Sequence, residues 1–320
     1  MRGVLTALAQ NKHCSSTRGT QKALAARGLI DPDGQLTHLG WQQAAVLLPL
    51  PEQCALVGIE YELLPGIRAN GEPEIAAWKH FSSKGWVGAF CEGGPVLLLL
   101  SVAEVKESID PWKASPVGPE RPRRFLLLLH GSIIRSAALD TLARLNSFGS
   151  RQDACTRFTE AQLTILRNEA PQILVAIRAA SSAVVVAAFK EIYSSLMVQE
   201  YYPGLTSEVI ATLFEALGAE RLASIAEAII EDPYTYRSGW PDLTMTRGGE
   251  MQWVEIKTTD KLHMSQVTTI HRMKPLLPGS VRVVQLAAVG DKAAATSNYP
   301  VNPTASGSRR SPSAAGYRRR

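Results

Sequence analysis

Two short β-prone runs joined by a glycine turn constrain the C-terminal third of the chain more than any other feature. The runs cover residues 243–245 and 251–256, with Arg-Gly-Gly-Glu at 247–250 between them. β-prone runs separated by a short glycine-containing turn predict an antiparallel hairpin. Such a hairpin places Asp242, at the start of one strand, beside Glu255, near the end of its partner. The sequence therefore predicts two carboxylates side by side.

A lysine joins this pair, because Lys257 lies two residues after Glu255 and so projects from the same face of the strand. Two carboxylates and a lysine at one point are costly to assemble unless something holds them together. Mg²⁺ does so, since it takes oxygen ligands that include one or two carboxylates. The lysine could then bind a phosphate oxygen or orient an attacking water. The alternative is a surface hairpin with an ordinary Glu–Lys pair, because Glu-x-Lys alone is not a specific motif.

Four sequence pieces around the hairpin occur in a recognisable order. They are Arg237–Leu243 (RSGWPDL), Val254–Lys257 (VEIK), Asp260–Leu262 (DKL) and Gln266. Together they resemble the VRR-NUC branch of the PD-(D/E)xK nucleases, the catalytic module of the Fanconi-associated nuclease and of small phage and bacterial junction nucleases. The resemblance covers roughly residues 200–288.

The resemblance implies a fold and an activity. The fold is α/β (α+β), a restriction-endonuclease-like core with a mixed central sheet flanked by helices. The activity is Mg²⁺- or Mn²⁺-dependent hydrolysis of DNA phosphodiester bonds, with Lys257 positioning the attacking water. The implied metal ligands are Asp242, Glu255, the backbone carbonyl of Ile256, and Glu208.

Three further assignments depend on this resemblance. Glu208 corresponds by position to a helix glutamate of the family, although a first-turn glutamate is also favoured simply by the helix dipole. Gln266 corresponds to a glutamine that orients the active site, and its alternative is a solvated residue near a helix start. Arg237 and Lys261 are expected to contact the substrate. No long helical insertion separates Glu208 from Asp242, which departs from the large Fanconi-associated nucleases and leaves their substrate preference in doubt here.

The expected function is a structure-specific DNA nuclease acting on flap or branched DNA in repair or replication. Related modules cut flaps, act as exonucleases or resolve junctions, and junction resolution needs two active sites and hence a homodimer. The alternative is a non-catalytic DNA-binding or regulatory winged-helix protein with a silent nuclease fold. A silent fold would have lost a core residue, yet Asp242, Glu255 and Lys257 are all present.

The first 50 residues have the order helix, short strand, tight turn, short strand, helix. Residues 17–27 predict a helix that ends at Gly28, and Thr37 is placed to cap the next one. Between them, Pro-Asp-Gly at 32–34 predicts a tight turn. This order resembles a winged-helix module, which in many proteins contacts DNA and in many others contacts protein.

The middle of the chain is less specific. Residues 51–70 read as a Pro- and Gly-punctuated connection, residues 71–84 as an amphipathic helix, and the apolar run 95–102 as strand-like. A second Glu-x-Lys, at 104–106 with Glu92 twelve residues earlier, is interpreted as a decoy because it lacks the Pro-Asp and the glutamine helix. The sequence thus predicts a winged-helix-like region (1–50), a small α+β element and linker (51–124), a helical section (125–199), the VRR-NUC domain (200–288) and a disordered basic tail (289–320).

Composition limits the function less than the motif does. The chain has 320 residues and a net charge of +5, but the tail from Val289 accounts for all of it, so residues 1–288 sum to zero. A phosphate-binding surface must therefore come from local clustering or from the tail. No apolar run reaches the ~18 residues that would span a bilayer, and no signal peptide is expected. The four dispersed cysteines predict reduced thiols in a cytoplasmic protein, nucleoid-associated if bacterial and nuclear if eukaryotic.

Overall fold

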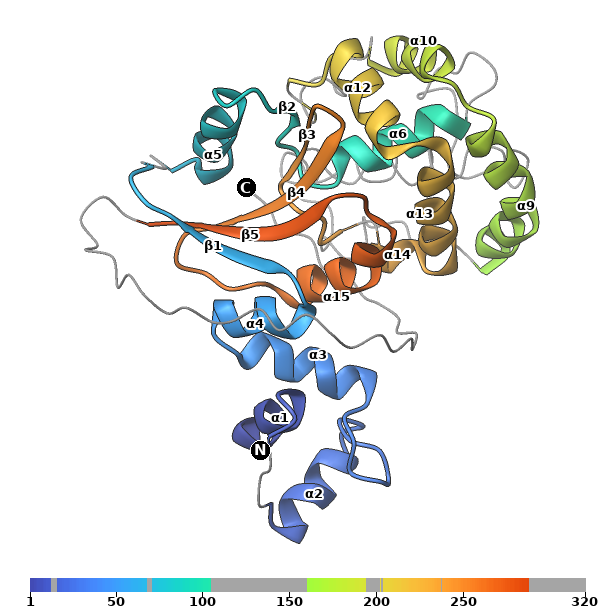
Figure 1. Cartoon of the computed structure of the whole chain (residues 1–320). Helices are drawn as coiled ribbons and strands as arrows, with labels where there is room; N and C mark the ends of the chain where they lie inside the picture. Colours follow the sequence, from blue (N-terminus) through green and yellow to red (C-terminus); the bar gives the residue numbers. More distant parts are fainter. Residues whose placement is uncertain are drawn as a thin grey trace, which may run out of the picture.

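A computed structural model describes most of the chain (Figure 1). The described residues are 1–12, 16–67, 71–104, 160–193, 202, 204–236 and 238–287. Four predictions lie wholly or partly outside them: the contact of Arg237 with substrate, the basic tail at 289–320, most of the linker that ends at residue 124, and residues 125–159 and 194–199 of the helical section.

A five-stranded mixed sheet forms the centre of the molecule, in the order β1-β5-β4-β3-β2. Strands β2, β3 and β4 pair antiparallel, whereas β5 runs parallel to both β4 and β1. Helices flank this sheet, so the predicted α/β class with a mixed central sheet is confirmed. The strands are β1 (Glu60–Leu64), β2 (Val87–Ala89), β3 (Leu243–Arg247), β4 (Glu250–Lys257) and β5 (Ser280–Leu286).

The predicted hairpin is strands β3 and β4. Leu243 pairs with Val254 and Arg247 with Glu250. Gly248 and Gly249 form the two-residue turn with φ of 59° and 86°, a left-handed conformation that glycine adopts without a Cβ clash and that suits the twist of a tight hairpin.

The sheet separates two apolar clusters. On one face, Leu243, Met245, Val254 and Ile256 pack against Phe81 of the helix α5 (Pro73–Ser82). On the other face, side chains of β4 and β5 belong to the main core together with α4 (Leu50–Val57), α15 (Met264–Met273) and the helices drawn at the upper right of Figure 1. Strand residues alternate between the two faces, so Glu255 and Lys257 project from the side that α15 covers.

The helices account for the rest of the described chain. Within it, no single helix is long and apolar enough to cross a membrane; one pair of segments, Ala170–Arg178 and Ser182–Lys190, passes that test together but is bent by 110°. The helices are α1 (Arg2–Ala9), α2 (Arg18–Ala25), α3 (His38–Leu47), α4 (Leu50–Val57), α5 (Pro73–Ser82), α6 (Gly94–Glu104), α9 (Glu160–Arg178), α10 (Ser182–Tyr193), α12 (Ser207–Leu217), α13 (Ala219–Glu231), α14 (Pro233–Tyr236), α15 (Met264–Met273) and the 3₁₀ turn η2 (Lys274–Leu276).

Two sequence interpretations were wrong. The apolar run 95–102 is not strand-like but lies in α6, and its side chains Val96, Leu99 and Leu100 are buried in the main core. A continuous apolar run carries no period, so it fits a buried helix as well as a strand. Residues 51–70 are not a bare connection but hold most of α4 and all of β1. Prolines at a helix start and a left-handed Gly58 at its end bound α4.

The N-terminal helices α2 and α3 begin at the threonines that the sequence indicated. Thr17 and Thr37 cap α2 and α3 by accepting hydrogen bonds from backbone amides three residues on. The two short strands of the expected wing are reduced to one isolated bridge, between Ile30 and Leu36. The central sheet draws β1 and β2 from the predicted 51–124 region and its other strands from the 200–288 region.

Candidate active site

A pocket of about 690 Å³ opens where β4 ends and α15 begins. Five carboxylates line it, together with a single cationic side chain, that of Lys257. The lining residues are Pro73, Glu74, Glu92, Ser238, Gly239, Trp240, Asp242, Glu255, Ile256, Lys257, Thr258, Thr259, Asp260, His263, Met264, Ser265 and Gln266.

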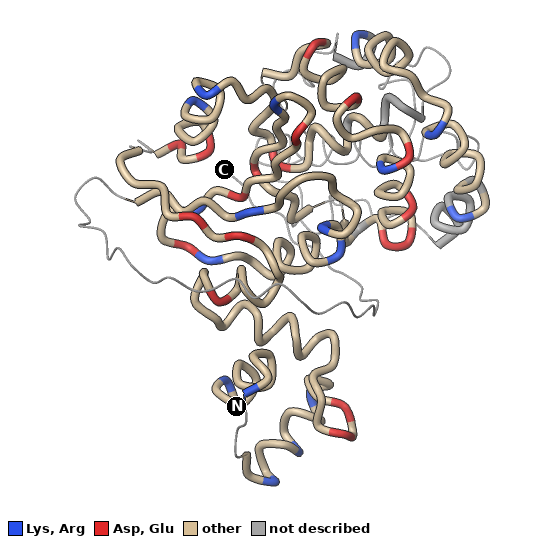
Figure 2. The backbone as a smooth tube through the Cα atoms, in the orientation of Figure 1, with Lys and Arg blue, Asp and Glu red and all other residues tan. Residues whose placement is uncertain are grey.

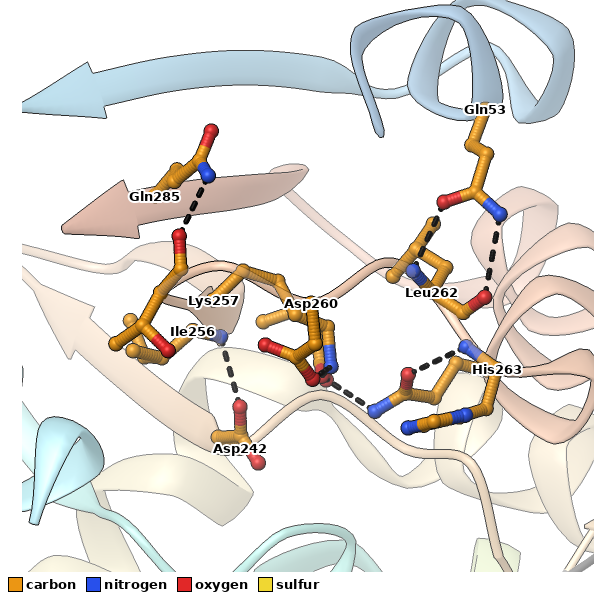
Figure 3. Close-up of polar contacts among 11 residues, drawn as sticks. Gln53, Asp242, Ile256, Lys257, Asp260, Leu262, His263 and Gln285 are labelled. Atoms are coloured by element: carbon orange, nitrogen blue, oxygen red, sulfur yellow. Dashed lines mark hydrogen bonds and ion pairs between the residues drawn. The ribbon is translucent and has the colours of Figure 1, made fainter. Parts of the chain in front are cut away.

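The hairpin brings the two predicted carboxylates together. Because Leu243 pairs with Val254, Asp242 and Glu255 are the next positions on the two strands. The Asp242 carboxylate accepts a hydrogen bond from the backbone amide of Ile256 at 2.7 Å (Figure 3). The side chains of Asp242 and Glu255 are buried, at 8% and 1% exposure. Both are therefore acids that folding has removed from bulk water.

Lys257 completes the cluster. Its Nζ lies 2.7 Å from Oε1 of Glu255 and 3.4 Å from the Asp260 carboxylate. Burial opposes the charged ammonium, but Glu255, Asp242 and Asp260 outweigh it and hold the pKa of Lys257 above its ordinary value. Lys257 is therefore a fixed positive charge in an otherwise acidic pocket.

The pKa values of the two buried carboxyl groups, Asp242 and Glu255, are both raised. Burial, and then the charge of Glu255, raise the pKa of Asp242 well above its ordinary value, although the Ile256 amide and Lys257 act in the opposite direction. Burial likewise raises the pKa of Glu255, against the favourable effect of Lys257. The pocket thus holds carboxylates whose charge Lys257 does not balance.

Helix α15 fixes the orientation of Glu255. Gln266 donates a hydrogen bond from Nε2 to Oε1 of Glu255, and its own side-chain oxygen accepts from the His263 amide at 2.9 Å. His263 is the N-cap of α15 in a capping-box arrangement. The other oxygen of Glu255, Oε2, is buried without a hydrogen-bond partner in the described part of the chain.

A close backbone approach sets α15 against the pocket. Gly239, which lines the pocket, has φ of 78°, and a Cβ there would lie 2.4 Å from the backbone oxygen of Ser265. Only glycine permits this contact. The buried hydroxyl of Thr269 also donates to the backbone oxygen of Ser238 at 2.6 Å, which ties the segment before Asp242 to α15.

Two glutamines hold the loop that links Lys257 to α15 (Figure 3). The fully buried Gln53 of α4 accepts from the amide of Leu262 at 2.8 Å and donates to its carbonyl oxygen at 3.2 Å. At the other end of the loop, Gln285 of β5 donates to the carbonyl oxygen of Thr258 at 2.5 Å. The loop that carries Asp260 is therefore fixed from both sides.

Three acids of the pocket were not predicted as site residues: Asp260, which follows Lys257 closely in sequence, and the distant Glu92 and Glu74. Glu92 follows β2, and its backbone amide donates to the carbonyl oxygen of Asp242 at 3.1 Å. Burial, followed by Glu255 and Glu74, raises the pKa of Glu92 to about 7. Glu74 lies in the first turn of α5. Neither has a recognisable spacing from Asp242 in sequence, because the pairing of β2 with β3 brings Glu92 there.

The structure does not bring Glu208 to this pocket. Glu208 lies in the first turn of α12, fully exposed, and a hydrogen bond with Thr206 lowers its pKa. The helix buries its opposite stripe, which includes Ile210, Leu213 and Leu217, and this turns Glu208 outward. Glu208 therefore fits the simpler alternative, an acid favoured at a helix N-terminus.

Of the remaining predicted site residues, some line the pocket and others do not. Ile256 and Gln266 line the pocket. Lys261 is exposed and does not line it; its Nζ donates to the carbonyl oxygen of Leu47 at 3.3 Å. Arg237 lies outside the described residues.

The donor set fits a divalent cation in one particular way. Among the described residues, no group of three or more His, Cys, Asp or Glu side chains is arranged as a ready-made cage. Mg²⁺ does not require one, because it commonly uses one or two carboxylates and retains several waters. The adjacent Asp242 and Glu255, with a buried carboxylate oxygen left unpartnered, fit that mode of binding.

Fold and pocket together define a mixed α/β protein with an acidic pocket at the end of its central hairpin. No known protein family profile matches the chain, and no curated protein matches it. Two solved structures that resemble it are crystal structures of paFAN1 bound to 5′-flap DNA with a gap, one with a two-nucleotide and one with a one-nucleotide flap.

The resemblance to paFAN1 is distant. The first structure is 16% identical with a TM-score of 0.46, and the match covers 84% of this chain and 45% of that one. The second is 17% identical with a TM-score of 0.47, and the match covers 89% of this chain and 52% of that one. The chain thus spans about half the length of the solved chains it matches.

Proposed function

We propose that this chain is a divalent-cation-dependent nuclease that hydrolyses DNA phosphodiester bonds, with the pocket around Asp242 as its active site. The observation that carries the proposal is the convergence of Asp242, Glu255 and Lys257 in one pocket, with Lys257 2.7 Å from Glu255. Buried acids whose charge is not balanced lower stability. A cation on Asp242 and Glu255 would supply the missing charge.

Each residue has a role in this proposal. Asp242 and Glu255 would hold Mg²⁺ or Mn²⁺, with the backbone carbonyl of Ile256 as a further ligand. When bound, the cation would neutralise charge on the phosphate and lower the pKa of a water. Lys257, held charged, positions the attacking water and stabilises negative charge in the transition state. Gln266 keeps Glu255 in its orientation.

The third carboxylate near the cation is proposed to be Glu92, whereas the sequence led us to expect Glu208. Glu92 takes the part proposed for Glu208, because it lines the pocket and its pKa of about 7 places it where a nearby cation would deprotonate it. Glu74 of α5 extends the acidic lining on the same side. Lys261, which does not line the pocket, and Arg237 remain proposed substrate contacts.

We also propose membership of the VRR-NUC branch of the PD-(D/E)xK nucleases, on the residues that carry the resemblance, and a flap or branched DNA substrate in repair or replication. Junction resolution would further require two copies, because a junction is cut at two symmetric positions.

The test is a cleavage panel with the purified full chain. Labelled linear, 5′-flap and four-way-junction DNAs are incubated with EDTA, Mg²⁺ or Mn²⁺, and the oligomeric state is measured in the same buffers. Cation-dependent cleavage that Asp242→Ala abolishes is expected. DNA binding without cleavage under any cation would instead identify the non-catalytic DNA-binding alternative, and equal cleavage by Asp242→Ala would refute the site.

A further inference from the structure

Positive charge is concentrated in the first 30 residues of the chain. This segment contains five basic residues and no acid. The whole chain carries +5, and the tail from Val289 has six basic residues and one acid, so residues 31–288 carry a net −5. The five basic residues are Arg2, Lys12, Arg18, Lys22 and Arg27.

All five of these side chains are exposed. None forms an ion pair with a carboxylate within the described chain. The apolar faces of α1 and α2 point inward, where Leu5 and Leu24 pack with Ile30 and Ala44. Figure 2 shows these helices standing apart from the sheet, with acidic positions only at the turn that precedes α3. We refer to the five exposed cations as the basic face.

Folding stability does not account for the basic face. Arg18 and Lys22 are four residues apart on α2, so they lie on one side of the helix and repel each other. Arg18 also occupies the first position of α2, where the helix dipole disfavours a positive charge, and the first turn holds no acid to offset it. Lys22 lies in the last turn, where the dipole favours a cation, so the unfavourable features are the position of Arg18 and its repulsion with Lys22. An anionic partner would offset both.

Because the pocket is acidic, the attraction that brings a polyanionic nucleic acid to it must come from another part of the molecule. Its lining has five carboxylates and one lysine, so it repels a polyanion before a cation is bound. Helix α3, against which α1 packs, adjoins the pocket loop: it packs against α15, and Lys261 of that loop donates to the carbonyl oxygen of Leu47 at the end of α3. Helix α3 therefore connects the pocket loop to α1, and Lys261 lies where α3 meets that loop.

We propose that the basic face binds the phosphate backbone of a nucleic-acid duplex without sequence preference and holds the duplex beside the pocket. The inference rests on the proposed nuclease function and names the part of the chain that supplies the affinity. A duplex fits better than a membrane, because Leu5 and Leu24 on the apolar faces of α1 and α2 are buried and, of the described residues there, only Met1 beside α1 is a large exposed apolar side chain.

The experiment measures binding apart from cleavage. Fluorescence anisotropy with the full chain in EDTA records the affinity for a labelled 30-base-pair DNA duplex, an RNA duplex and anionic vesicles at several salt concentrations. The test variant is R18Q/K22Q/R27Q. The matched control, K79Q/K190Q/R221Q, removes three exposed charges from α5, α10 and α13. Melting curves verify that both fold.

We expect the duplex affinity of the test variant to weaken by about tenfold or more. The log–log salt slope should also fall by about 0.9 for each phosphate that is no longer neutralised, while the control stays within twofold of the wild type. R18K/R27K should retain affinity, because only the positive charge matters for this binding. Equal weakening in the test and control variants, or loss of vesicle binding with duplex affinity intact, would overturn the proposal. If Asp242→Ala still cleaves, the proposed function fails while this binding result stands.

Discussion

Asp242 and Glu255 are acids whose charge water solvates poorly, because their side chains are buried in the lining of the pocket. Burial raises the pKa of both, and Lys257 balances only part of the charge. A carboxyl group whose pKa is raised on folding binds its proton more tightly in the folded state. Its contribution to stability is therefore present at low pH and is lost as pH rises through the folded-state pKa. Without a cation, this site should weaken the fold at neutral and alkaline pH.

Asp242→Asn removes that penalty and tests it. Its amide can still accept a hydrogen bond from the Ile256 amide but carries no charge. In EDTA at about pH 8, we expect a melting temperature about 3–6 °C above wild type, as 1–2 kcal/mol would produce in a domain of this size. The difference should vanish below about pH 3, where the carboxyl is protonated in both states. The exposed Asp33→Asn is the control, and a lower Tm for Asp242→Asn at every pH would contradict this account.

Glu92 and Glu208 offer a direct comparison between the acid in the pocket and the acid outside it. Cation binding requires ionised carboxylates, and the pKa of Glu92 is about 7. Mn²⁺ affinity measured by calorimetry should therefore rise as pH increases through about 7.

Glu92→Gln should flatten that pH dependence and weaken Mn²⁺ binding about tenfold. Glu208→Gln should leave both the affinity and its pH profile within twofold of wild type, because Glu208 is exposed on α12. The reverse ranking would restore Glu208 to the site.

The sequence was sufficient to predict three site residues that are close together in the chain, but not Glu92, which is distant. Asp242, Glu255 and Lys257 lie within 16 positions, so a hairpin pattern and the two-residue strand period were enough to bring them together. Glu92 reaches the pocket because β2 joins β3 across more than 150 residues. That pairing leaves no spacing to recognise, so the only local signal was an acid after a β-prone run.

At the scale of the element, the loop between β4 and α15 determines the geometry of the site. It carries Asp260, which pairs with Lys257, and it leads into the helix whose Gln266 contacts Glu255. Gln53 satisfies both the amide and the carbonyl group of Leu262 in that loop.

Gln53→Met keeps a side chain of similar length but removes every hydrogen bond. Because buried amide and carbonyl groups are left unpaired, we expect a loss of about 3 kcal/mol in the free energy of unfolding. Urea denaturation measures this loss. Cleavage measured under conditions where the variant remains folded should also fall, because the loop is no longer held. The exposed Gln172→Met on α9 should change neither the free energy of unfolding nor the cleavage. If the two variants behave alike, the Gln53 hydrogen bonds do not stabilise the loop.

Helices could be predicted from the sequence where a capping residue or a hydrophobic period identifies them. Thr17 and Thr37 start helices in the structure as the sequence predicted. The apolar run in α6 gave no such signal, because it packs among α9, α10, α12 and α13 and is buried around its circumference. Burial on all sides removes the polar face that periodicity needs.

At the scale of the molecule, one sheet joins two parts of the chain that the sequence separated. Strands β1 and β2 cover both outer edges of the β3–β4–β5 unit, and Phe81 of α5 packs on one of its faces. A piece comprising residues 200–288 alone would expose both edges and that apolar face.

We therefore expect residues 200–288 not to fold independently. Expressed alone, this piece should show no cooperative thermal transition, whereas residues 50–288 should retain one. Circular dichroism melting of the two pieces makes the comparison. A cooperative transition in the shorter piece would support the division at residue 200 and would contradict its dependence on β1, β2 and α5.

The central claim is that Asp242, Glu255 and Lys257 form a cation-dependent site for phosphodiester cleavage. The most direct measurement is the single-turnover cleavage rate of a labelled flap DNA in Mn²⁺, for wild type, Asp242→Asn, Glu255→Gln, Lys257→Met and Glu208→Gln. We predict losses of about a hundredfold or more for the first three variants, a rate within twofold of wild type for Glu208→Gln, and no cleavage in EDTA. Cleavage that persists in EDTA, or that survives Asp242→Asn, would contradict the claim.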